Sequence, residues 1–220
     1  MEYPRVYRHF CMMARALEVV GERWSLLVVR DLLFGPRRFT DLLHSLSDIS
    51  PTRLTGRLRR LEAAGIVMRD PPTVGREVWY RLSEAGRELS PVVDALTLWG
   101  MDHQLEPPKA DEPVYPGPVM IGTKVFLSGH ARGLRAPVTW VWRFPADGDF
   151  TIRHEDGDWA LNRGAADPAD LVIEASVPAW ARFLTVRGAR RLPRRDIRLA
   201  GKAEAVKSFA RAFSAELRSG

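Results

Sequence analysis

Apolar residues recur at helical spacing through the first part of the chain. One face of a predicted helix over residues 13–20 carries Met13, Ala16, Leu17 and Val20. A second helix, over residues 24–33, is apolar on nearly every side, which predicts that it lies at the centre of a domain. Gly35-Pro36 ends it, and a short third helix is predicted to start near Thr40 and run to Leu46. This pattern predicts a small helical domain.

A fourth predicted helix, over residues 51–64, has both a start and a stop signal. Ser50 is a favoured N-cap residue, Pro51 suits the first helical position, and Gly65 suits the position just past the end. Its apolar residues Leu54, Leu58 and Leu61 share one face. The sequence therefore predicts an amphipathic helix with a buried leucine face.

Two short strands are predicted after this helix, at residues 66–69 and 78–82, with a turn-rich segment between them. We interpret the pair as a β-wing. Ser83 can cap a long helix that follows, and the apolar stripe of this helix is long enough to pack against a partner subunit. The residues of that predicted dimerisation stripe are Leu89, Val92, Val93, Leu96 and Trp99.

The second half of the chain has a different pattern, dominated by strands. Prolines at residues 107, 108 and 113 predict a linker over residues 107–118 between a domain at 1–106 and another at 119–220. Alternating and apolar runs separated by Asp-Gly turns predict strands at residues 124–128, 138–144, 150–154, 159–161, 171–173 and 197–199. A short helix from Pro178 and a final amphipathic helix over residues 206–217 complete a predicted α+β fold.

Charge is concentrated in one stretch of the first half. The chain of 220 residues has 33 Lys and Arg against 27 Asp and Glu, a formal net charge of +6. Residues 37–60 contain six arginines and two aspartates, which favours a polyanionic partner for this stretch. A single cysteine excludes an internal disulfide and a multi-cysteine metal site, so we expect neither metal nor cofactor. The absence of a long apolar run and of an export signal predicts a cytoplasmic protein without a membrane partner.

The face opposite the leucines makes helix 51–64 a candidate for insertion into the major groove of DNA. Arginine can neutralise phosphates or pair with guanine, threonine can contact phosphate or a thymine methyl, and glycine lets the backbone approach closely. An arginine-rich helix face is more often simply solvated, but a preceding short helix and a following wing favour DNA binding here. The candidate DNA-binding residues are Arg37, Arg38, Ser50, Thr52, Arg53, Thr55, Gly56, Arg57, Arg59, Arg60, Arg69 and Arg76.

Residues 11–100 resemble the HxlR family of winged helix-turn-helix regulators, which are related in fold to the MarR regulators. The resemblance rests on Cys11, Gly21-Glu22-Arg23-Trp24, the run 30–39, Ile49-Ser50-Pro51, Leu54-Thr55-Gly56-Arg57-Leu58, the run 61–67 and the run 80–86. It implies a homodimer that binds palindromic operators, with dimer contacts from the first and last helices of the domain. The chain departs from the family at Met12, where proline is common, and at Gly56, where a longer polar residue is common.

In some members of this family a cysteine at the N-terminal position senses oxidants or electrophiles. Cys11 is therefore a candidate sensor, with Arg8, His9 and Arg15 nearby to favour its reactive thiolate form. The alternative is a small residue that simply packs near the dimer interface.

The segment 150–215 is similar to sterol-carrier-type lipid-binding domains. The similarity lies in residues 159–161, 169–173, 180–186 and 197–202, and it implies an apolar tunnel. Candidate lining residues are Trp140, Trp142, Phe144, Trp159, Trp180, Phe183, Phe209 and Phe213, although such rings are most often ordinary core residues. An arginine-rich run over residues 187–198 could meet DNA, an acidic ligand or a membrane surface, or could be a solvated edge.

These patterns together predict a dimeric, sequence-specific DNA-binding regulator, a repressor by analogy with the family. A small apolar effector bound by the second half, or modification of Cys11, would alter its operator affinity. Two alternatives are a lipid or hydrophobic-metabolite carrier that uses the helical half only to dimerise, and a non-specific architectural DNA binder. No phosphate-binding loop, zinc-protease motif or nucleophile elbow is present, so the sequence does not predict an enzyme.

Overall fold

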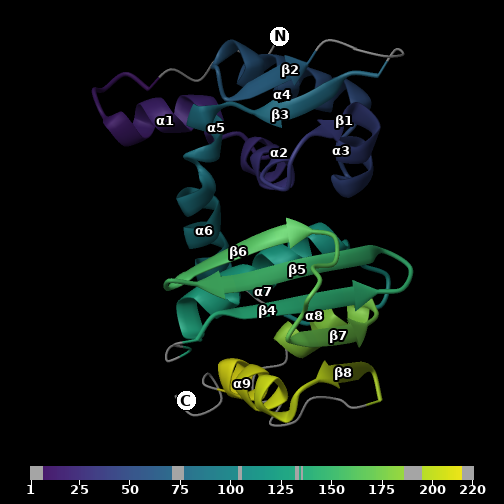
Figure 1. Ribbon diagram of the computed structural model, residues 1–220. Helices are drawn as coiled ribbons and strands as arrows, with labels where there is room; N and C mark the ends of the chain where they lie inside the picture. Colours follow the sequence, from purple (N-terminus) through teal and green to yellow (C-terminus); the bar gives the residue numbers. More distant parts are fainter. Residues whose placement is uncertain are drawn as a thin grey trace. The chain divides into compact units, whose positions relative to one another are not determined.

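The computed structural model describes residues 7–70, 77–103, 106–131, 134, 136–185 and 195–214. The chain forms two compact units, Met1–Val93 and Asp94–Gly220, coloured along the sequence in Figure 1. The division falls inside helix α6 (Ser90–His103), before the proline-rich segment at which the sequence predicts a linker. Within the described part of the chain, no helix has the length and apolar character needed to cross a membrane.

The first unit is a set of helices with a small antiparallel sheet. Its elements before α6 are α1 (Met12–Val20), α2 (Ser25–Leu32), β1 (Arg37–Arg38), α3 (Phe39–Ser45), α4 (Pro51–Ala63), β2 (Val67–Asp70), β3 (Trp79–Leu82) and α5 (Glu84–Arg87). The strand order is β1-β3-β2, with both pairings antiparallel. The helices and both wing strands are confirmed, whereas the sequence did not predict β1. The single long helix predicted after Ser83 is instead two helices, α5 and α6.

Local signals account for the limits of α4. The hydroxyl of Ser50 accepts a hydrogen bond from the backbone N–H of Arg53 at 3.4 Å, and Pro51 occupies the first turn, as the sequence predicts. Past the end, Gly65 adopts a φ of 71°, a left-handed conformation that suits glycine. The N–H of Ile66 reaches the carbonyl of Leu61 at 2.9 Å, and that of Gly65 reaches Glu62 at 2.9 Å. This pair of bonds is a Schellman motif, which satisfies carbonyls at the helix end.

Helix α3 begins one residue before the predicted position. The side chain of Asp41 accepts a hydrogen bond from the backbone N–H of Arg38 at 3.0 Å, and Phe39 is the first helical residue. The N-cap residue is therefore Arg38, because an acidic side chain in the first turn can satisfy the amide of the residue before the helix.

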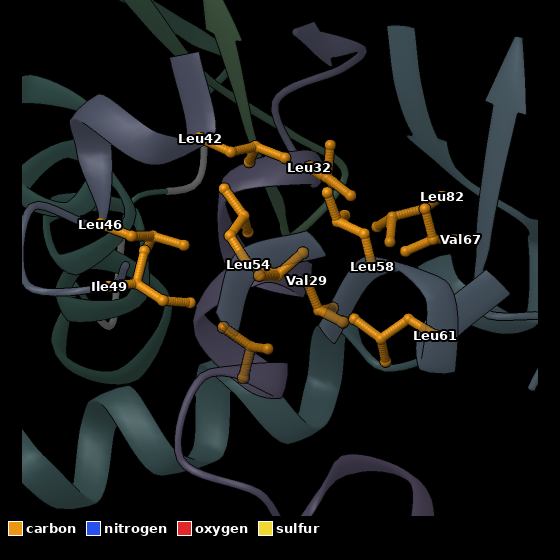
Figure 2. Close-up of a cluster of buried hydrophobic side chains, with 12 residues drawn as sticks. Val29, Leu32, Leu42, Leu46, Ile49, Leu54, Leu58, Leu61, Val67 and Leu82 are labelled. Carbon is orange, nitrogen blue, oxygen red and sulfur yellow. The ribbon is translucent and has the colours of Figure 1, made fainter. Parts of the chain in front are cut away.

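One hydrophobic core holds the first unit together, and Figure 2 shows how its side chains converge. Helix α2 lies at the centre, as predicted, because Val28 and Val29 are completely buried. The other members of the core are Leu32, Leu42, Leu46, Ile49, Leu54, Leu58, Leu61, Val67, Leu82 and Val93. Burial of each such side chain contributes about 1.5 to 3 kcal/mol, so this core fixes the position of α4.

The second unit is a five-stranded mixed sheet with helices. Its elements after α6 are α7 (Pro116–His130), β4 (Val138–Phe144), β5 (Gly148–Glu155), β6 (Asp158–Arg163), β7 (Leu171–Ala175), α8 (Val177–Thr185), β8 (Ile197–Gly201) and α9 (Ala203–Ser214). The strand order is β6-β5-β4-β7-β8. Strands β4 and β7 are parallel, and the other neighbours are antiparallel. Helix α7 packs against the sheet and runs behind it in Figure 1. The α+β class is confirmed.

The prediction of a strand at residues 124–128 is wrong, because these residues lie in α7. Val125, Phe126 and Leu127 are buried in succession, and a short run of buried apolar residues fits a strand and a buried helix equally well. Pro116 stands in the first turn of α7, so the last three residues of the predicted linker are helical.

Candidate nucleic-acid interface

The two faces of α4 differ in exposure as the sequence predicts. Leu54, Leu58 and Leu61 are at most 2% exposed and belong to the core. The opposite face is open to solvent and carries Thr52, Arg53, Gly56, Arg59 and Arg60. The buried leucines therefore anchor a helix whose outer face is cationic.

Gly56 lies in the middle of this outer face. A Cβ atom added there would meet nothing within 4 Å, so no packing contact requires glycine. Glycine at a helix interior costs about 1 kcal/mol relative to alanine. The position leaves the backbone of α4 accessible to a close neighbour such as a nucleic-acid strand.

Arg53 and Arg59 are the most available cations of this face. Neither forms an ion pair with another described residue, and both are exposed. Charges of this kind can neutralise phosphates or pair with guanine edges in a major groove. Arg53 and Arg59 are therefore the strongest candidates for nucleic-acid contact on α4.

The structure separates Arg57 and Arg60 from these two arginines. Both form ion pairs with Glu22, which precedes α2, and the Arg57 side chain is only 11% exposed. Arg60 remains 47% exposed. Arg57 thus lies on the flank of α4 against Glu22 instead of on the outer face. Sequence reasoning did not identify Glu22, because the acidic partner lies more than 30 residues before Arg57 and Arg60.

The hydroxyls of Ser50 and Thr55 take part in the helix itself. Ser50 caps α4, and Thr55 donates a hydrogen bond to the carbonyl of Pro51 at 2.9 Å. Both side chains therefore have structural roles, whereas Thr52 points to solvent without such a bond in the described chain.

A row of side chains crosses the three-stranded sheet beside α4. Tyr80 on β3 lies opposite Arg37 on β1 and opposite Arg69 on β2, so the three share one face. The next pair on this face, Val67 and Leu82, is buried in the core, which orients the face toward α4.

The environment of Tyr80 shows that arginines of both elements gather there. Burial raises the pKa of Tyr80 above its ordinary value of 10.0; Arg69 opposes the rise, Glu62 adds to it, and Arg59 of α4 again opposes it. Arg69, which lies opposite Tyr80, and Arg59 of α4 therefore act on one phenol together with Glu62, and we call these two arginines the basic cluster beside Tyr80. The sequence did not identify Tyr80, because its partner strand β1 has only two residues and carries no strand signal.

The other face of the wing is electrically balanced. Arg38 forms an ion pair with Glu77 at 2.8 Å and lies over the ring of Trp79, 4.7 Å from its centroid. Arg81 pairs with Asp70 at 2.8 Å. The candidate residue Arg38 is thus engaged within the wing, and the candidate Arg76 lies outside the described residues.

The predicted dimerisation stripe of α6 divides into two groups. Val92, Leu96 and Trp99 are 43%, 52% and 55% exposed. Leu89 and Val93 instead pack into the core of the first unit, so they are not available to a partner. Further exposed apolar side chains lie at and before α1: Phe10, Met12, Met13 and Leu17. Cys11 is half-buried at the N-cap position of α1.

The aromatic residues proposed to line a tunnel pack against one another in the second unit. Trp140, Trp142, Trp180 and Phe209 are completely buried, and the ring centroids of the pairs in contact lie 5.2 to 6.4 Å apart. The indole N–H of Trp180 donates to the hydroxyl of Thr123 at 2.8 Å. The buried indole nitrogens of Trp140 and Trp142 have no hydrogen-bond partner among the described residues. Trp159, Phe183 and Phe213 complete the cluster.

Comparisons with known proteins match the first part of the chain, which contains α4 and the wing. The family model described as HxlR-like helix-turn-helix matches residues 19–107. An uncharacterised HTH-type transcriptional regulator of Mycobacterium tuberculosis is 45% identical over 94 residues, which span 42% of this chain and 59% of that relative. Another from Synechocystis is 40% identical over 95 residues, 43% of this chain and 70% of the relative.

Among solved structures, the chain is similar to the redox regulator HypR in its oxidised form, with 33% sequence identity and a TM-score of 0.40. The match covers 43% of this chain and 98% of the HypR chain. The two sequence relatives are regulators rather than enzymes by name, and their similarity lies within the matched first part of the chain. The chain therefore belongs to the HxlR-like helix-turn-helix family of transcriptional regulators.

Proposed function

We propose that this protein is a sequence-specific DNA-binding transcription regulator that inserts α4 into the major groove of its operator. The observation that carries the proposal is the outer face of α4, where Arg53, Gly56 and Arg59 are exposed above a buried leucine face. A helix held in this way can present charged side chains to base edges and phosphates while its position is fixed by the core.

The basic cluster beside Tyr80 supports a second contact. Arg69 lies on the wing strand β2, Arg59 lies on α4, and both act on the same phenol. We propose that this cluster contacts the phosphate backbone next to the groove that α4 reads. Phosphate contacts fix the orientation of a protein on DNA, whereas base contacts supply the sequence preference.

Selection from a random duplex library with the 220-residue chain, followed by affinity measurements at several salt concentrations, tests the proposal. We expect Arg53→Ala to weaken operator binding by about 1 to 3 kcal/mol and to leave the fold intact. Arg153→Ala, an exposed arginine of β5 in the second unit, is the matched control. Wild-type operator affinity in Arg53→Ala and in Arg59→Ala would refute the assignment of α4.

The same measurement separates the regulator from the two alternatives. A lipid or hydrophobic-metabolite carrier would give no salt-sensitive, sequence-selective complex. An architectural DNA binder would bind all sequences with nearly equal affinity.

We also propose that the regulator is a homodimer that binds a palindromic operator. Val92, Leu96 and Trp99 expose apolar surface on α6, and Phe10 and Met13 do so at α1. Sedimentation of Leu96→Glu tests this: we expect a shift toward monomer and a parallel loss of operator affinity, because two half-sites then bind independently. A dimer unaffected by this substitution would contradict the role of the α6 stripe.

For the second unit we propose the role of a regulatory half, similar to sterol-carrier-type domains, that binds a small apolar molecule and thereby alters operator affinity. The support is the pair of buried indole N–H groups of Trp140 and Trp142, which have no partner among the described residues and can donate to acceptor atoms of a ligand. Tryptophan fluorescence titrated with a medium-chain fatty acid tests this. No change in emission and no effect on operator affinity would reject that ligand class.

The role of Cys11 as a sensor stays a prediction. HypR, to which this chain is similar, is named a redox regulator, and Cys11 lies at the start of α1 in this chain. Operator binding measured with and without an oxidant such as diamide, in the wild type and in Cys11→Ser, checks it. We expect oxidant to change the affinity of the wild type alone.

A further inference from the structure

Glu22 places one carboxylate across one turn of α4. Its Oε2 atom pairs with the guanidinium of Arg57, and its Oε1 atom pairs with that of Arg60. Arg57 and Arg60 are three residues apart, so their side chains leave the same side of the helix one turn from each other. A single acidic side chain from outside the helix thereby neutralises two of the four arginines of α4.

The position of Glu22 is set by the end of α1. Gly21 closes α1 through a hydrogen bond from its N–H to the carbonyl of Leu17 at 2.8 Å. A Cβ atom at Gly21 would come within 2.5 Å of that carbonyl oxygen, so only glycine fits this close turn. Because α1 also contacts α4, the backbone that carries Glu22 is held beside the flank of α4.

The exposures of the three side chains explain why this arrangement matters for DNA. Arg57 is 11% exposed, Glu22 is 35% exposed, and Arg60 is 47% exposed. A phosphate could approach Arg60 only in competition with a carboxylate already in contact with it. Arg53 and Arg59, in contrast, have no ion pair with another described residue.

We propose that Glu22 is a specificity-determining residue, because it withholds Arg57 and Arg60 from phosphates and so lowers affinity for DNA of arbitrary sequence. This inference rests on the proposed function of α4. Phosphate attraction supplies essentially all of non-specific binding, whereas operator binding also uses base contacts. Removal of two cations from phosphate contact therefore weakens non-specific complexes more than the operator complex.

Glu22→Gln in the 220-residue chain tests the inference, since glutamine keeps the shape of the side chain and removes its charge. We expect the variant to bind a random-sequence duplex more tightly than the wild type does. We also expect the plot of log K against log salt concentration to be steeper by about 1 to 2, because each added phosphate contact changes its slope by about 1. Between about 50 and 200 mM KCl the variant then loses about 4- to 16-fold more affinity than the wild type. The ratio of operator to random-duplex affinity falls.

Glu18→Gln is the matched control, because it causes the same change in net charge and its carboxylate contacts Arg15 and the Tyr7 amide instead of α4. We expect the control to keep the wild-type salt slope within experimental error. Adding Arg60→Gln to Glu22→Gln should return about half of the steepening. A Glu22→Gln slope equal to that of Glu18→Gln, or a loss of affinity for both duplexes, would overturn the proposal.

Chemical modification of arginine provides a readout that does not depend on DNA. We expect phenylglyoxal to modify Arg57 slowly in the wild type and at least severalfold faster in Glu22→Gln, as followed by mass spectrometry of peptides. Equal rates in the two proteins would show that the ion pairs do not persist in solution and would overturn this inference alone. A wild type that selects no duplex sequence would instead overturn the proposed function.

Discussion

Replacement of Gly56 by alanine is a direct test of the structure of α4. Gly56 lies in the interior of a 13-residue helix on an exposed face, and an added Cβ meets nothing within 4 Å. The difference in helix propensity between glycine and alanine is about 0.8 to 1 kcal/mol, and no steric cost offsets it here. We therefore expect Gly56→Ala to raise the free energy of unfolding by about 0.8 to 1 kcal/mol. For a unit of this size the melting temperature rises by about 4 to 8 °C.

Urea and thermal unfolding followed by circular dichroism at the helical band measure this change. Gly122→Ala in α7 is the matched control, because a Cβ there also meets nothing within 4 Å and the residue lies in the second unit. Lower stability of Gly56→Ala would refute the open environment described for this position.

The same variant distinguishes stability from function. If α4 approaches DNA through the backbone at Gly56, the added methyl group should cost about 1 kcal/mol or more of operator affinity despite the gain in stability. Gly122→Ala should leave operator affinity unchanged. Full operator affinity in the stabilised Gly56→Ala variant would refute close approach at this residue.

Three further predictions concern stability. Leu58→Ala should lower the free energy of unfolding, measured with urea, by about 2 to 5 kcal/mol, because the Leu58 side chain is only 2% exposed in the core. Thr52→Ala, on the outer face of α4, should change the same free energy by less than about 0.5 kcal/mol. The pKa of Tyr80 is raised in the folded protein, so the stabilising contribution of the protonated phenol is present below pH 10.0 and is lost as pH rises through the raised pKa. The free energy of unfolding of Tyr80→Phe should therefore fall less than that of the wild type between about pH 8 and 11. Equal pH dependence of the two free energies would contradict the raised pKa. Thr123→Val removes the hydroxyl that accepts the hydrogen bond of the Trp180 indole N–H. It should lower the free energy of unfolding, followed by tryptophan emission, by about 1 to 3 kcal/mol.

Short-range signals allowed much of the first unit to be predicted. Ser50, Pro51 and Gly65 mark both ends of α4, and each acts through hydrogen bonds or backbone angles within a few residues of itself. The division of α4 into a leucine face and a cationic face follows from helical periodicity alone. That periodicity therefore suffices to assign Thr52, Arg53 and Gly56 to the outer face.

Patterns that do not distinguish two conformations led to the errors. Buried residues 125–127 fit a strand as well as a helix, and the helical choice depends on packing against the sheet. Strand β1 has two residues and forms only because β3 offers it a partner. Without knowledge of β1, no sequence pattern groups Arg37, Tyr80 and Arg69.

The sequence by itself determined which helix has a cationic face, because periodicity and capping depend on residues close together along the chain. Only the tertiary structure decided which of its arginines remain available. Glu22 lies far before Arg57 and Arg60 in the sequence, and the ion pairs form because the end of α1 is held beside α4. Coulomb attraction depends on distance in space, and the fold sets that distance for residues far apart in the chain.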